Sequence, residues 1–169
     1  LSPLYPGDCR YNAACTGKFF IHRLDITDSE LLAAAKASCE NELELIDVRQ
    51  GYAKCSTIIV DENSIITYDK GIAKPCEAAG MNVLIVEPGF VKLRGADTGF
   101  IGGASGRVDG EIVFNGDLSA HPNFREIVDF IEARGLGCKW FDSYELEDIG
   151  SYEKTRYYSN IHTAPRLSQ

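Results

Sequence analysis

The chain has 169 residues, of which 44% are hydrophobic and 25% charged, a composition typical of a single globular domain with a substantial core. Its formal net charge of -8 argues against nucleic acids and anionic membranes as partners, because an acidic surface repels phosphate groups. The sequence has no apolar run long enough to span a bilayer and no visible secretory signal, so a cytoplasmic protein is expected.

The first predicted unit covers about residues 8–48. A strand, a return strand, a helix and a closing strand are predicted in residues 12–16, 19–22, 28–39 and 43–48. Gly17-Lys18 supplies the hairpin turn, and Thr27 or Asp28 caps the helix.

The second unit, residues 49–89, repeats this order. Its strands and helix are predicted in residues 52–60, 64–68, 70–79 and 81–87, the last as a buried apolar strand. Pro75 lies inside the helical stretch, so the helix either begins near Lys74 or is kinked. Gly80 is placed to end the helix in a left-handed conformation.

The third unit, about residues 97–142, has the same elements in residues 99–108, 111–115, 122–134 and 136–141. Asp109-Gly110 is a strong hairpin signal, and the helix has Pro122 at its start and Gly135 beyond its end. Residues 145–150 are expected to add an edge strand. Residues 152–169 are expected to form a polar tail after a domain that covers residues 1–151.

The three turns are centred near residues 17, 62 and 109, at a nearly constant spacing within the range of ~20–50 residues found in repeat proteins. The sequence therefore predicts an α/β protein of three ββαβ units. A generic α/β sandwich with coincidental hairpins is the alternative.

The six cysteines are spread along the chain, and none shows the short spacing of zinc or redox motifs. We expect reduced thiols that are mostly small buried hydrophobic groups. No metal ion and no organic cofactor is predicted.

Three stretches resemble an uncharacterised bacterial branch of the pentein superfamily, the α/β propellers of guanidino-group modifying enzymes. They are residues 50–69 (QGYAKCSTIIVDENSIITYD), 97–106 (DTGFIGGASG) and 148–151 (DIGS), and the resemblance extends over roughly residues 4–151. It implies five units around a central channel, although this sequence shows three. Two units are then expected before Leu1, unless the ring is completed in another way.

The resemblance also implies that the first strand of each unit, with the loop before it, lines the channel. This nominates residues from all three units and from the final segment: Asp8, Asn12, Cys15, Arg49, Gln50, Lys54, Cys55, Arg94, Asp97, Gly102, Gly103, Asp148 and Ser151.

Pentein hydrolases use a nucleophilic Cys, a His and carboxylates that hold a guanidinium group. By this resemblance Cys55 is the candidate nucleophile, although a buried structural thiol is the alternative, and Lys54 would repel a guanidinium. Neither His22 nor His162 follows a first strand, and His121 is expected on the surface at the start of a helix. Cys138 lies on a third strand, so the family's C-terminal Cys has no counterpart.

Asp97 lies in a glycine-flanked loop after Arg94, where its carboxylate could bind a cation or cap its own turn. The Gly102-Gly103 pair allows close approach of a ligand or of another backbone, as at a tight junction between units. A phosphate site is not expected, since no helix follows these glycines.

Two functions remain open from the sequence. The first is binding of a small cationic, guanidino or amide metabolite, with Cys-dependent C–N hydrolysis as an extension of it. The second is a non-catalytic interaction protein on the same scaffold. Self-association that buries open sheet edges is the third option.

Overall fold

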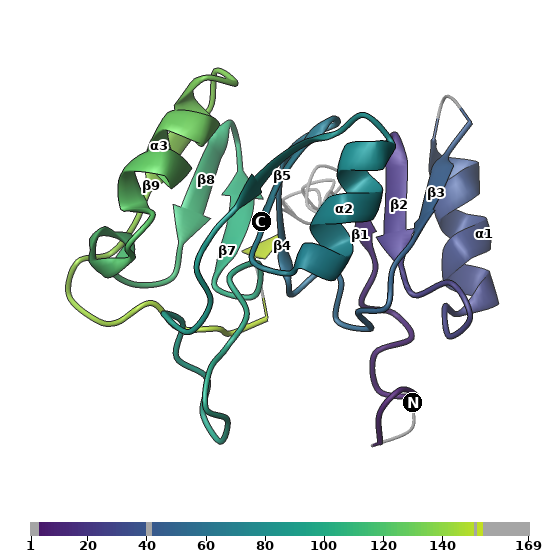
Figure 1. The fold of residues 1–169 in the computed structure, drawn as a ribbon, viewed down its shortest axis with the longest axis horizontal. Helices are drawn as coiled ribbons and strands as arrows, with labels where there is room; N and C mark the ends of the chain where they lie inside the picture. Colours follow the sequence, from purple (N-terminus) through teal and green to yellow (C-terminus); the bar gives the residue numbers. More distant parts are fainter. Residues whose placement is uncertain (1–3, 40–41, 151, 154–169) are drawn as a thin grey trace, which may run out of the picture.

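The computed structural model describes residues 4–39, 42–150 and 152–153. Three small sheets lie side by side, each with one helix, and α3, α2 and α1 follow one another from left to right in Figure 1. In each unit the first strand pairs antiparallel with the second, and the second pairs parallel with the third. The predicted α/β architecture of three ββαβ units is therefore confirmed.

The elements fall into the three units as follows. Unit one contains β1 (Ala14–Cys15), β2 (Phe19–His22), α1 (Ser29–Ser38) and β3 (Glu44–Asp47). Unit two contains β4 (Thr57–Asp61), β5 (Ser64–Thr67), α2 (Lys70–Ala78) and β6 (Asn82–Ile85). Unit three contains β7 (Ser105–Val108), β8 (Glu111–Phe114), a 3-10 turn (Leu118–Ala120), α3 (Phe124–Glu132) and β9 (Gly137–Lys139).

The first strands of units two and three are shorter than the sequence suggests. A turn precedes β4, closed by the Ser56 amide donating to the Tyr52 carbonyl at 2.9 Å. The same turn precedes β7, where the Ala104 amide donates to the Phe100 carbonyl at 3.1 Å. Lys54 and Cys55 therefore lie in a turn and not on a strand, which corrects their predicted placement.

Two further expectations need correction. β6 is not a buried strand, since Ile85 is 41% exposed at the edge of its sheet. The edge strand expected at residues 145–150 is replaced by isolated bridges, and a short strand, β10 (Tyr152–Glu153), pairs parallel with β7. α2 begins at Lys70 as predicted, with Pro75 inside it, which leaves out the alternative of a start near Lys74. The rest of the predicted tail lies outside the described residues.

Local capping explains where the helices begin and end. The Asp28 carboxylate accepts hydrogen bonds from the second and third amides of α1, and the Asp69 carboxylate accepts one from Gly71. Gly80 follows α2 at φ +83°, the left-handed conformation predicted for it. Asn123 precedes α3 without capping it. Its side chain instead accepts a hydrogen bond from the Glu87 amide at 2.8 Å and so ties unit three to unit two.

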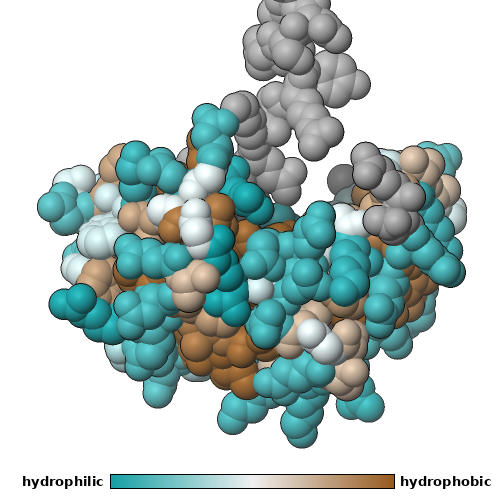
Figure 2. Space-filling model, turned by 90° about the horizontal axis from the view of Figure 1, so that it is seen from above, coloured by the Kyte–Doolittle hydropathy of each residue, from teal (hydrophilic) through white to brown (hydrophobic). Residues whose placement is uncertain are grey.

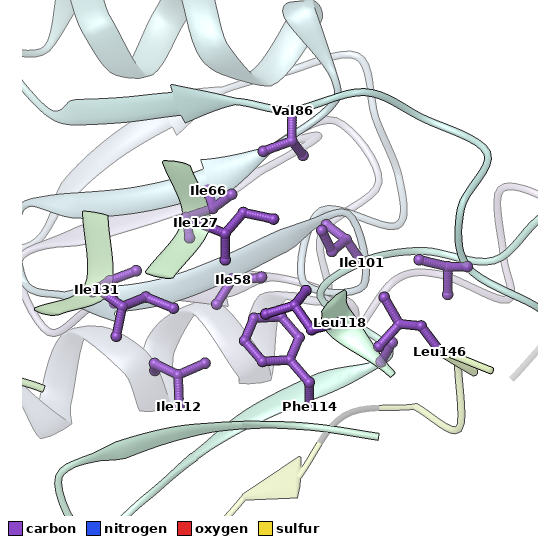
Figure 3. Packing of buried hydrophobic residues seen from close by; sticks show 13 residues of the cluster. Ile58, Ile66, Val86, Ile101, Ile112, Phe114, Leu118, Ile127, Ile131 and Leu146 are labelled. Carbon is purple, nitrogen blue, oxygen red and sulfur yellow. The ribbon is translucent and has the colours of Figure 1, made fainter. Parts of the chain in front are cut away.

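Each of the later helices fills the wedge between its own sheet and the sheet of the preceding unit. Ile65 and Ile66 are neighbours on β5 and point to opposite faces. Ile65 packs with α2 and with the unit-one sheet, in a cluster that includes Phe19, Ile21, Ile46, Ile72 and Cys76. Ile66 packs with α3 and unit three, in a cluster that includes Ile58, Ile112, Phe114, Ile127 and Ile131 (Figure 3).

The face of unit three that points away from unit two is more polar than the equivalent faces of units one and two. Ile46, Leu84 and Lys139 occupy equivalent places, since they pair with Ile21, Ile66 and Val113 on the second strands. Ile46 and Leu84 belong to the apolar clusters, whereas the Lys139 ammonium is exposed and pairs with Glu111 at 2.8 Å. The outer face of unit three is therefore compatible with water.

Main-chain hydrogen bonds join the inner turns of successive units. The Lys54 amide donates to the Asn12 carbonyl at 2.9 Å, and the Gly103 amide donates to the Cys55 carbonyl at 2.9 Å. The Gly150 amide then donates to the Gly103 carbonyl at 3.1 Å. The final segment, residues 142–150, therefore takes the position that the next inner turn of the series would occupy.

The described helices are all too short or too polar to cross a membrane. Viewed from above, polar side chains cover most of the molecule, with an apolar area near the lower centre (Figure 2).

We predict that Gly102→Ala lowers the free energy of unfolding by about 3 kcal/mol, because the new Cβ would collide with backbone that has little freedom to move. That Cβ would lie 2.4, 2.6 and 2.6 Å from the carbonyl oxygens of Thr57, Cys55 and Lys54. Urea unfolding followed by circular dichroism measures the change. The matched control is Gly137→Ala, whose Cβ would meet only the flexible side chain of Glu111, at 3.0 Å or more, and which should shift stability by less than about 0.5 kcal/mol. Equal effects of the two variants would contradict the close approach of units two and three.

Candidate functional site

The inner turns of the three units and the final segment meet at one place, which we call the axial site. It consists of Asp8, Asn12, Tyr52, Cys55, Tyr68, Phe100 and Asp148. Each part of the chain contributes from a loop or turn held by the hydrogen bonds between units, so the site depends on the assembly of all three units.

Asn12 and Cys55 form the best-defined contact in the site. The Asn12 amide group donates from Nδ2 to Cys55 Sγ at 3.0 Å, and its Oδ1 accepts from the Cys55 backbone amide at 3.0 Å. The Asn12 backbone carbonyl also accepts a hydrogen bond from the Lys54 amide, so the main chain holds Asn12 next to Cys55. The structure thus brings together the nominated residues Asn12, Lys54 and Cys55.

The surroundings of Cys55 favour the neutral thiol. Burial raises the pKa of Cys55, and the charge of Asp148 adds to this effect. The Asn12 hydrogen bond and the charge of Lys54 act in the opposite direction and lower the pKa, without overcoming burial. A thiol must lose its proton to attack a carbon atom, so a catalytic role for Cys55 stays a prediction.

Four aromatic rings form a row across the axial site, which we call the aromatic row. Tyr5 stacks on Tyr52 with centroids 6.3 Å apart, Tyr52 lies 5.6 Å from Phe100, and Phe100 lies 6.4 Å from Tyr68. Tyr5 is exposed and the other three rings are partly buried. The row presents aromatic surface from all three units.

Two carboxylates flank the aromatic row. Asp8 accepts a short hydrogen bond from the Tyr52 hydroxyl, and this bond raises the pKa of Tyr52 to about 12. Asp148 accepts from the amides of Phe100 and Gly150, both at 3.0 Å. A Cβ at Gly103 would lie 2.1 Å from Asp148 Oδ1, so this glycine makes room for the carboxylate.

The nominated residues Arg94 and Asp97 lie elsewhere. Both are exposed in the loop between β6 and β7, and neither bonds to the axial site within the described part of the chain. Asp97 lines a separate cleft of about 660 Å³ between residues 89–92 and 142–146, so its binding role stays a prediction tied to that cleft.

The two described histidines are buried, and neither forms a hydrogen bond with a side chain of the axial site. His22 Nε2 lies 2.9 Å from the Gly51 carbonyl oxygen and 3.1 Å from that of Cys9, so its ring joins units one and two. His121 is only 4% exposed, which corrects its predicted surface position. Its Nδ1 accepts a hydrogen bond from Asn123 and its ring packs edge-on to Phe90. His162 lies outside the described residues.

Sequence reasoning missed the aromatic row. Tyr52 and Phe100 each follow a glycine at equivalent places in their units, and this repeat was the available signal. No local sequence pattern distinguishes Tyr5 or Tyr68, because only the packing of the units brings them next to Tyr52 and Phe100. In the described residues, no group of three His, Cys, Asp or Glu side chains is placed to hold a metal ion.

Residues 1–152 match DUF6873, a family of unknown function. The chain belongs to this family. Among solved structures, this DUF6873 protein is similar to C. jejuni agmatine deiminase, with a TM-score of 0.54 and 8% identity over 83% of the present chain. The match covers 55% of that enzyme, so the chain spans about half of its length. The predicted pentein-like fold is confirmed by this match. No curated protein matches the sequence.

We predict that Asn12→Asp raises the pKa of Cys55, because an anionic oxygen replaces the group that donates to the sulfur. Alkylation of Cys55 by iodoacetamide, followed by peptide mass spectrometry between pH 7 and 10, should fall at neutral pH by roughly tenfold for each pKa unit gained. Asn82→Asp, on β6, is the matched control and should leave the profile unchanged. An unchanged profile in Asn12→Asp would show that the amide does not control the thiol.

The buried histidines predict a loss of stability in mild acid. Burial lowers the pKa of His22 and of His121 below the ordinary value of 6.5, so the unfolded chain binds protons that the folded chain excludes. Their contribution is present above pH 6.5 and is lost as the pH falls, by up to about 1.4 kcal/mol per pH unit for each histidine. Urea unfolding from pH 7.5 to 5.5 measures the slope, and His121→Gln should make it shallower. An equal slope in that variant would argue against a buried neutral His121.

Proposed function

We propose that this DUF6873 protein binds a small organic cation, of the guanidinium or amine class, at the axial site. The observation that supports this most strongly is the aromatic row between the Asp8 and Asp148 carboxylates. Aromatic faces attract cations by about 0.5–2 kcal/mol, depending on how far the pair is removed from water. A net charge of -8 raises the local concentration of cations further.

The charges suggest how a ligand would lie. The Lys54 ammonium influences Cys55 and would repel a cation at that end of the site. The cationic group would therefore lie toward Tyr5, Tyr52 and Asp8. The neutral part of the ligand would then face Asn12 and the thiol, where an amide group could exchange hydrogen bonds with the Asn12 side chain.

Thiol-dependent C–N hydrolysis is the second candidate, supported by the Asn12–Cys55 contact. The protonated thiol and the position of both described histidines make binding without turnover the better-supported function. Binding without turnover agrees with the second function left open by the sequence, a non-catalytic protein on the same scaffold.

Isothermal titration with agmatine and arginine tests the proposal, with citrulline as a ligand that lacks the guanidinium charge. We expect the cations to bind and Phe100→Leu to weaken that binding about tenfold, since loss of one ring costs about 1–2 kcal/mol. Asp8→Asn should weaken it at least as much, whereas Asp97→Asn, in the separate cleft, should leave it unchanged.

Equal weakening by Asp97→Asn, or cation binding that is insensitive to Phe100→Leu, would rule out the axial site. Cys55→Ser separates the two candidate functions. If ammonia or urea is released by the parent protein and not by this variant, hydrolysis is supported. Unchanged binding with no release in either protein supports binding alone.

A further inference from the structure

The cleft that contains Asp97 is separate from the axial site and has a wall on either side. Residues 89–92, which follow β6, form one wall, and residues 142–146 of the final segment form the other, around a volume of about 660 Å³. The Lys92 amide donates to the Leu146 carbonyl at 2.8 Å, and the Asp148 amide donates to the Lys92 carbonyl at 2.8 Å. The main chain therefore fixes the two walls relative to each other.

The lining of this cleft is acidic. The Lys92 ammonium pairs with Glu145 at 3.3 Å, and the Asp117 carboxylate caps the 3-10 turn that follows it. Asp97 and Asp142 are exposed and form no hydrogen bond or ion pair within the described part of the chain. Two carboxylates of the cleft are therefore available to a cationic group.

Exposed aromatic rings accompany these carboxylates. Phe90 and Tyr144 line the cleft and are 47% and 42% exposed. Phe141 is 48% exposed and stacks on Tyr144, with ring centroids 6.0 Å apart. Aromatic faces beside carboxylates favour Arg and Lys side chains and further aromatic rings. The cleft therefore suits a few residues of a segment that is both basic and aromatic.

The chain itself contains a segment of this kind after β10. Residues 154–169 hold three of the 17 basic residues, Lys154, Arg156 and Arg166, none of the 25 acidic residues, and the pair Tyr157-Tyr158. All the acidic side chains therefore belong to the other part of the chain. A segment of this length spans about 50 Å when extended, more than the diameter of roughly 40 Å expected for a domain of this size. The cleft is thus within its reach.

We propose that residues 154–169 dock in this cleft of the same molecule, with a guanidinium group at Asp97 and Asp142 and a tyrosine ring on Phe90 or Tyr144. The opposite charges of the two parts support this pairing, and the tether supplies an effective concentration on the order of mM. Asp97 then binds a cation, as the sequence suggested, and the cation belongs to the protein's own chain.

Docking would also act on the final segment. Residues 142–146 lead directly to Asp148, whose carboxylate accepts a hydrogen bond from Phe100 in the axial site. A segment bound against this wall would hold the final segment in place. The inference concerns a different cleft and does not depend on the proposed cation site.

Limited digestion of the full chain with trypsin tests the proposal, because an arginine held in the cleft cannot enter the protease. Mass spectrometry follows cleavage after Arg156 and Arg166 in the native protein. The double variant Asp97→Asn/Asp142→Asn should be cleaved about five to ten times faster, since each exposed ion pair contributes a factor of about two to five. Sodium chloride at about 0.5 M should speed cleavage of the parent similarly and change the double variant little.

The matched control is Glu77→Gln/Asp129→Asn, which removes two exposed carboxylates from α2 and α3 and should leave the rates unchanged. Asp8→Asn, in the axial site, should also leave them unchanged.

Three results would overturn the proposal. The first is equal cleavage of the parent and the double variant in the cleft. The second is faster cleavage in Asp8→Asn, which would mean that the segment occupies the axial site. The third is protection that increases with protein concentration, which would mean that a second copy supplies the segment.

Discussion

The close approach of successive inner turns is the constraint on which the rest of the structure depends. Each turn donates a main-chain hydrogen bond to the turn before it, from Asn12 through Cys55 to Gly103. Backbone can approach backbone this closely only where no Cβ intervenes, and Gly102 provides this in unit three. Because main-chain atoms hold the turns together, the side chains of the turn residues remain available for other contacts. The aromatic row and the Asn12–Cys55 contact are both built from them.

The same arrangement fixes where hydrophobic surface is buried. The helix of a unit packs between two sheets, so the strand behind it must be apolar on both faces, as Ile65 and Ile66 show. Where a neighbouring sheet is not part of the described structure, the two ends respond differently. Unit three ends in the Lys139–Glu111 pair, whereas α1 of unit one keeps half-buried leucines and exposed alanines. Unit one therefore leaves more apolar surface in contact with water at its end of the row than unit three does.

Local signals in the sequence predicted the units well because a hairpin turn and a helix cap are each specified within a few residues. Asp109-Gly110 adopts the positive φ values that its turn requires, and Asp28 caps α1 as expected. The first strand of unit two was predicted to start at Tyr52, but β4 starts at Thr57. The residues before it form a turn, which only the main-chain bond from Ser56 to Tyr52 reveals. The structure brings Asn12, Lys54 and Cys55 together, because equivalent positions of a repeat converge. Tyr5 and Tyr68 could not be found, because their contacts depend on the packing between units.

The fold alone does not decide the chemistry, since 8% identity to agmatine deiminase shows a shared architecture and leaves the site to be judged on its own residues. In the axial site, the thiol and the proposed ligand are physically linked. Burial and Asp148 raise the pKa of Cys55, and the positive charge of a cation bound at the Asp8 end of the same site would act in the opposite direction and favour the thiolate. Linkage is reciprocal, so a ligand that favours the thiolate must bind more tightly as Cys55 loses its proton. The affinity for cations would then rise with pH in the parent protein and would be flatter in Cys55→Ser. The reactivity of the Cys55 thiol would therefore depend on whether a cation is bound in the axial site.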